Sequence, residues 1–261
     1  MTKARELSDY TGLQGDLALK SPVASPVFTG NVGVGVTPAN NATPASGLQV
    51  GATASIGAWE SGSNIITTIG SNSYFNSTYK YITTNTAALI RLINGAINFN
   101  VAPSGTADAA ISWTTAMTID NAGIVTKPYQ PAFDAYSPQN AYSSGNTTTS
   151  VNLSATRINT GNHYSTSGQR FVAPVAGVYQ FNYRTMINGA TSNAHLRMFK
   201  NGSTISGSDA HYSSTSGTGW NAWSISLLVS LAANDYVQIG HTSNESIYGN
   251  NYQSFNGHLI G

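Results

Sequence analysis

Carboxylates that could perform catalysis are scarce in the C-terminal half of the chain. Residues 128–261 hold only Asp134, Asp209, Asp235 and Glu245. Glycoside hydrolysis requires two carboxyl groups that flank the sugar bond, and no nucleophile motif accompanies these four. Asp209 and Glu245 lie in polar loops, where they could pair or bind calcium, although no motif supports a calcium site. We therefore expect no enzymatic activity.

All five histidines also lie in this half of the chain, at positions 163, 195, 211, 241 and 258. Their spacing contains no His-x₃-His pair of the type that ligates zinc. Three chains around an axis could each contribute one histidine to a metal, but nothing in the sequence supports this. The chain has no cysteine, which excludes disulfides, thiol nucleophiles and cysteine-ligated zinc. We expect ordinary hydrogen-bonding histidines and no cofactor.

Aromatic residues beside flexible polar loops are the best candidates for ligand contacts. Trp220 follows a Gly/Ser/Thr loop at 213–219, and a Tyr/Asn run occupies 248–252. Aromatic rings can stack on sugars, while Asn and Ser supply adaptable hydrogen bonds, as in antibody paratopes. The alternative is that these are solvated loops without a ligand. The candidate ligand-binding residues are Trp220, His211, Tyr212, Tyr248, Asn250, Asn251 and Tyr252.

The composition is polar without being charged. Charged residues make up 8% of the 261 and the net charge is +1, whereas Ser, Thr, Asn and Gly together number 113. A nucleic-acid binder would carry a basic excess or stripe, so no nucleic-acid partner is expected. Hydrophobic residues at 40% are enough for a packed core. No window holds 18 apolar residues, so we expect no membrane insertion.

The first half of the chain predicts short β-strands. Residues 1–20 start without the apolar core of a signal peptide and form an expected N-terminal attachment segment. Residues 21–47 are a Pro/Gly-rich linker, in which Val alternates with Gly from Val32 to Val36. Such glycine-rich alternation suits the close approach of several backbones. Residues 48–127 follow as a β-rich shaft, with an Asn94-Gly95 hairpin between strands at 89–93 and 96–101.

The second half, residues 128–261, predicts a two-sheet antiparallel sandwich. Residues 177–183 and 223–231 alternate strictly between apolar and polar, the pattern of half-buried antiparallel strands. Trp223 continues the apolar side of its strand, so we expect it in the core. Leu228 falls on the polar side of the same strand. An exposed leucine there is explained if that face meets another subunit.

Motifs in this half resemble the globular head of the q subunit of the first complement component, C1q. The resemblance covers about 130 residues in the family's order, with Ser167 and Asn234 in place of the usual Thr and Gly. It implies a jelly roll similar to tumour necrosis factor that assembles as a trimer and binds ligands. The matching phrases are Asn-x-Gly-x-x-Tyr at 159–164, Pro-x-x-Gly-x-Tyr-x-Phe-x-Tyr at 174–183, Lys-Asn-Gly at 200–202, Asn-Asp-x-Val at 234–237 and Ser-Phe-x-Gly-x-Leu-Ile at 254–260.

The preceding region resembles phage tail-fibre shafts. Ser-Pro-x-Phe-Thr-Gly at 25–30 leads into Val-Gly-Val-Gly, and further fibre-like phrases lie at 79–99 and 102–120. Together they predict an elongated homotrimeric all-β virion fibre, assembled in the host cytoplasm. Its N-terminus would dock on tail or capsid proteins, and its jelly-roll knob would bind a host-surface glycan or outer-membrane protein.

Three other functions remain open at this stage. The chain could be a structural capsid or tail decoration protein without a receptor, a depolymerase, or a secreted lectin-like bacterial protein. The scarcity of carboxylates argues against the depolymerase. The missing signal peptide and the fibre-like phrases argue against the secreted lectin.

Overall fold

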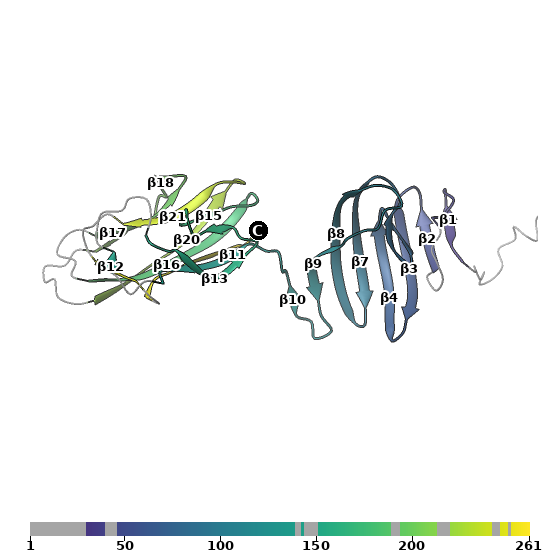
Figure 1. The fold of residues 1–261 in the computed structure, drawn as a ribbon, viewed down its shortest axis with the longest axis horizontal. Helices are drawn as coiled ribbons and strands as arrows, with labels where there is room; N and C mark the ends of the chain where they lie inside the picture. Colours follow the sequence, from purple (N-terminus) through teal and green to yellow (C-terminus); the bar gives the residue numbers. More distant parts are fainter. Residues whose placement is uncertain are drawn as a thin grey trace, which may run out of the picture. The chain divides into compact units, whose positions relative to one another are not determined.

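The computed structural model describes residues 30–39, 46–138, 142–143, 151–188, 194–212, 220–241, 246–249 and 252–261. The expected attachment segment 1–20 and the candidates Asn250 and Asn251 lie outside these ranges. The described residues are all-β, and none of them forms a helix able to cross a membrane. The chain divides into two compact units, Met1–Thr126 and Lys127–Gly261 (Figure 1).

The first unit contains one eight-stranded sheet. Its first two strands run parallel and every other neighbouring pair is antiparallel. At the predicted hairpin, Asn94 and Gly95 both adopt positive φ, 51° and 81°, as a two-residue turn between twisted strands requires. The strands, in sheet order, are β1 (Val32–Val34), β2 (Ser46–Val50), β3 (Ala54–Ser61), β4 (Asn64–Ser71), β7 (Asn85–Ile93), β8 (Ala96–Gly105), β9 (Thr114–Ile119) and β10 (Val125–Thr126).

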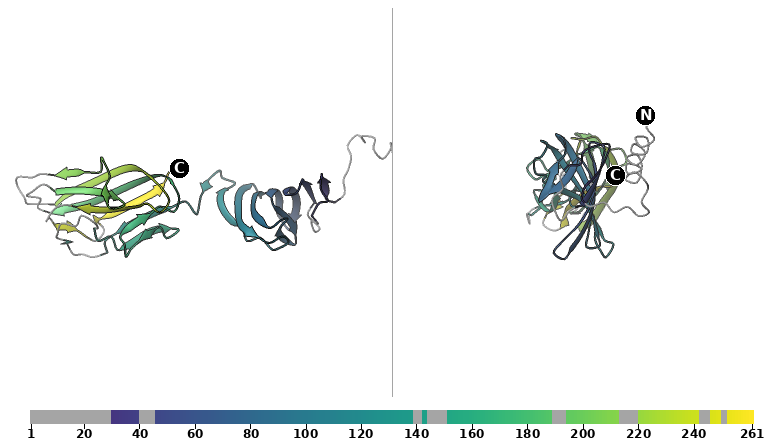
Figure 2. Two further views of the ribbon diagram at one scale, coloured as in Figure 1. Left: turned by 90° about the horizontal axis from the view of Figure 1, so that it is seen from above. Right: turned by 90° about the vertical axis from the view of Figure 1, so that its right-hand side faces the viewer.

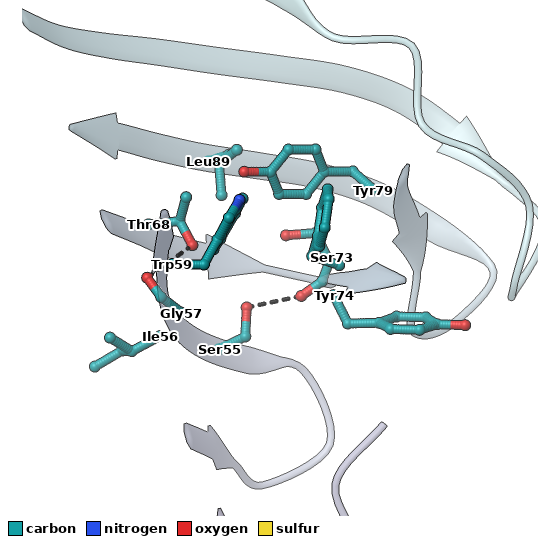
Figure 3. A pocket seen from close by; sticks show the side chains of 10 residues that line it. Ser55, Ile56, Gly57, Trp59, Thr68, Ser73, Tyr74, Tyr79 and Leu89 are labelled. Carbon is teal, nitrogen blue, oxygen red and sulfur yellow. Dashed lines mark hydrogen bonds between the residues drawn. The ribbon is translucent and has the colours of Figure 1, made fainter. Parts of the chain in front are cut away.

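A small hairpin covers one face of this sheet. It consists of β5 (Ser73–Asn76) and β6 (Thr78–Tyr81). Trp59 of β3 stacks on Phe75 of the hairpin with ring centroids 4.6 Å apart, and Tyr79 meets Trp113 edge-on at 5.8 Å. Figure 3 shows Trp59 directed toward this hairpin while Ile56, on the same strand, points away from it. These ring contacts, centred on buried Trp59, pack the hairpin against the sheet.

The second unit is a sandwich of two antiparallel sheets (Figure 2). The first sheet has the order β13 (Ala155–Thr160), β11 (Ala132–Tyr136), β23 (Ser254–Leu259), β16 (Gly177–Asn188) and β20 (Trp220–Leu231). The strands β22 (Ser246–Tyr248) and β12 (Tyr142–Ser143) extend it beside the end of β16. The second sheet comprises β14 (Tyr164–Ser165), β15 (Arg170–Val172), β21 (Tyr236–His241), β17 (Ala194–Lys200), β18 (Ser203–Thr204) and β19 (Ala210–Tyr212).

An aromatic core joins the two sheets. Phe133 lies 4.9 Å from Phe171 of the opposite sheet and 4.9 Å from Phe255, measured between ring centroids. Phe181 completes this group and is fully buried. Trp223 is buried in the same core, as its place in the alternation predicts. The alternating strands therefore form a jelly-roll sandwich with one face of each sheet turned outward.

Candidate functional site

Three of the predicted aromatic residues come together at one end of the first sheet of the sandwich. Trp220 begins β20, and Tyr248 ends β22. Both strands pair with the end of β16, where Asn188 lies between Trp220 on one side and Ser246 on the other. The rings of Trp220 and Tyr248 meet edge-on at 4.8 Å, and those of Tyr248 and Tyr252 at 4.6 Å. We call these three residues the aromatic cluster.

The aromatic cluster remains accessible. Trp220 is 37% exposed and Tyr252 is 48% exposed, which is high for such large rings. With Met186 they line a hollow of about 160 Å³. A neighbouring groove of about 310 Å³ shares Met186 and Tyr252 and is also lined by Arg184. The two hollows together offer aromatic faces, a polarisable thioether and one cation.

The described lining of the two hollows combines aromatic rings with polar groups and one charged residue, Arg184. Amphipathic rings that are held by neighbouring rings supply contact area at a small entropic cost. Arg184 adds hydrogen-bond donors but no acid. Within the described part of the chain, the residues that line the two hollows include no carboxylate and no histidine. Among the described residues, this lining offers aromatic faces and hydrogen-bonding groups of the kind that hold a ligand.

His211, another candidate, lies in a different group on the second sheet. Its ring packs on that of His195 with centroids 4.6 Å apart. Asp209 accepts hydrogen bonds of 3.0 and 2.8 Å from Arg197 and contacts His195 Nδ1 at 2.8 Å. Burial opposes the charge of Asp209, but the hydrogen bonds from Arg197 and His195 outweigh it and lower its pKa. This group is a cross-strand ion cluster of β17 and the segment before β19.

For Tyr212, only the backbone is described: it pairs with Ala194 at the edge of the second sheet. Among the described residues, no group of three His, Cys, Asp or Glu side chains is arranged to hold a metal ion.

The outward face of the first sheet carries a second candidate surface that sequence reasoning did not identify. A chain of side-chain hydrogen bonds crosses five strands of this sheet, β13, β11, β23, β16 and β20, and we call it the polar ladder. It passes from Arg157 to Asp134 (3.1 Å), Ser254 to Asp134 (2.6 Å), Asn256 to Ser254 (3.4 Å), Asn182 to Asn256 (3.1 Å) and Ser226 to Asn182 (2.8 Å). The polar residues that alternate along each strand were the available sequence signal. The hydrogen bonds of the polar ladder, however, depend on which strands are neighbours in the sheet.

Leu228 lies one step beyond the polar ladder on the same face. It pairs with Gln180, which in turn pairs with His258. Leu228 is 61% exposed, so its side chain is largely unpacked within one chain. Eight residue steps separate Trp220 from Leu228, which is about 27 Å of strand, so the aromatic cluster lies at the far end of β20 from this leucine.

Residues 132–260 match the family model described as the C1q domain. Among solved structures, the globular domain of zebrafish complement 1qA is similar, with 18% identity, a TM-score of 0.42 and coverage of 51% of this chain and 98% of that one. Eiger TNF from S. frugiperda (11%, TM-score 0.40, 51% and 93%) and murine APRIL (10%, 0.39, 50% and 98%) are also similar. No curated protein sequence matches the chain.

Proposed function

Because residues 132–260 form a C1q/TNF-like globular domain, we propose that the chain is a homotrimeric fibre protein of a phage particle. In this proposal the C-terminal domain binds a receptor on the host-cell surface, either a glycan or an outer-membrane protein. The observation that carries the proposal is the exposed aromatic cluster of Trp220, Tyr248 and Tyr252. Domains of this type are typically binding domains rather than enzymes.

The homotrimer is supported by the outward face of the first sheet. Domains of the C1q/TNF families commonly form homotrimers. The polar ladder would allow the part of this face from the ladder to Leu228 to be covered at low cost, because its side chains already satisfy one another. Exposed Leu228 and Val178 add apolar contact area on the same face.

The ligand is inferred from the chemistry of the aromatic cluster and its hollows. A binding surface of aromatic rings with a single charged residue in its described lining, Arg184, suits a sugar or a polar protein loop, and its affinity would depend little on salt. A single shallow site of this kind binds weakly. Three sites per trimer and several trimers per particle would convert weak contacts into avid adsorption.

The particle context rests on the fibre-like phrases of residues 25–120. The protein would assemble in the host cytoplasm and attach to tail or capsid proteins through residues 1–20. The first unit, with its eight-stranded sheet, would form the shaft.

The test is binding of the purified full-length protein to susceptible host cells. We expect saturable binding by the wild type and a loss of at least tenfold in affinity for Trp220→Ala and Tyr252→Ala. Tyr129→Ala is the matched control, because Tyr129 is a 63% exposed aromatic residue outside the cluster. Equal binding by all three variants would refute the assigned site. A folded trimer that binds no susceptible host would favour a structural capsid or tail decoration protein.

A further inference from the structure

The face of the eight-stranded sheet opposite the β5–β6 hairpin is apolar and uncovered among the described residues of this unit. Paired positions form a continuous transverse row across six strands. The row is Leu48, Ile56, Ile69, Ile90, Phe99 and Met117. Ile56 and Ile69 are 45% and 51% exposed. We call this the apolar face.

A second row runs beside the first. It joins Ala58, Thr67, Leu92, Ile97 and Ile119 through successive strand pairs. Leu92 is 40% exposed, and Ile65 at the end of β4 is 67% exposed. Ile65, Thr67, Leu92 and Ile97 line an open groove of about 490 Å³ on this side.

The two faces of the sheet are not equivalent. On the covered face, Ile66, Thr68 and Leu89 are buried. The alternation along β4 thus gives isoleucine and threonine on both sides, the pattern of a strand that is buried on both faces. Ordinary monomers rarely expose contiguous apolar patches larger than roughly 300–600 Å². This pattern is typical of a sheet that is covered on both faces.

We infer that the apolar face packs against the same face in other copies of this chain. Its paired rows carry no charged side chain; Glu60, at the end of β3, lies on the same face at its border, where it pairs with Ile65. A surface of Ile, Leu, Ala and Thr is complementary to itself and offers no charge pattern for a different partner. If the C-terminal domains trimerise as proposed above, tethering would raise the local concentration of the three sheets to the millimolar range. The number of three chains rests on the proposed function, whereas the packing of one apolar face on another does not.

The chain lacks cysteine, so a single engineered thiol reports on one position. Full-length Ile69→Cys places a thiol at the centre of the apolar face. Full-length Thr78→Cys is the matched control, because Thr78 is exposed on the hairpin that covers the opposite face. The measurement is the rate of maleimide labelling of each native protein, together with its mass in solution. Ile69→Thr is a second variant that keeps a β-branched residue in the strand.

We expect Ile69→Cys to react at least tenfold more slowly than Thr78→Cys, and a bifunctional maleimide to link Ile69→Cys chains to one another. We also expect Ile69→Thr to lower the temperature at which the first unit unfolds in a concentration-dependent manner. Equal labelling rates in an oligomer held by the C-terminal domain would overturn the inference and leave the proposed trimer intact. Slow labelling without a trimer of the C-terminal domain would support the inference and remove the stoichiometry of three. A monomer with rapid labelling at both positions would overturn both proposals.

Discussion

Replacing Leu228 with serine is the sharpest perturbation of the proposed trimer. Serine matches Ser226 and Ser230, which flank this position on the outward side of β20, so the sandwich itself should tolerate the change. Burying a whole leucine side chain contributes about 1.5–3 kcal/mol. Leu228 is 61% exposed in one chain, so covering it contributes about 1–2 kcal/mol per chain and about 3–6 kcal/mol per trimer.

That loss of free energy corresponds to a decrease of about 10²–10⁴-fold in the trimer association constant. Sedimentation equilibrium of the full-length protein over a range of concentrations measures it directly. Val175→Ser is the control, because Val175 is 48% exposed and lies in the turn before β16, outside the sheet. An unchanged association constant for Leu228→Ser, or equal changes in the two variants, would refute the assignment of this face to the interface.

Two further predictions concern the stability of the C-terminal domain. Phe255→Ala should lower its free energy of unfolding by about 3–5 kcal/mol, because Phe255 is fully buried against Phe133 and Phe181; urea unfolding followed by near-ultraviolet circular dichroism measures this, and a loss below 1 kcal/mol would contradict the described core. Asp235 accepts hydrogen bonds from Lys200, Asn201 and the Ala232 amide, which lower its pKa to about 2. Because its unfolded pKa is about 3.9, its contribution to stability is complete above about pH 4 and is lost as the pH falls toward about 2. Asp235→Asn should remove that part of the acid-unfolding profile, and an unchanged profile would show that these partners do not act on the folded state.

Much of the fold could be predicted from local sequence. The Asn94-Gly95 turn predicted a hairpin, which the structure contains. The alternation on either side of Trp223 predicted that this tryptophan is buried, and it is. The C1q-like motifs predicted the jelly roll, and residues 132–260 match the C1q domain. Each of these signals lies within a short window or a motif of fixed spacing. The all-β class follows from the same signals.

Features that depend on pairing between distant strands could not be predicted. Asp134 and Ser254 are 120 residues apart, and only the position of β11 beside β23 brings them together in the polar ladder. His211 lies just before the candidate loop at 213–219 in sequence, but its place in β19 puts it against His195. The apolar face could not be predicted either. The alternation in each strand fits a sheet with one solvent-exposed face as well as a sheet that is covered on both faces.

The most direct test of the proposed function is competition for adsorption. Susceptible cells would be incubated with increasing amounts of purified full-length protein, and particle adsorption would then be counted. We predict that the wild type blocks adsorption at saturation, whereas Trp220→Ala, which leaves the aromatic core intact, requires at least tenfold more protein. Full adsorption in the presence of saturating, folded, trimeric wild-type protein would contradict the receptor-binding account.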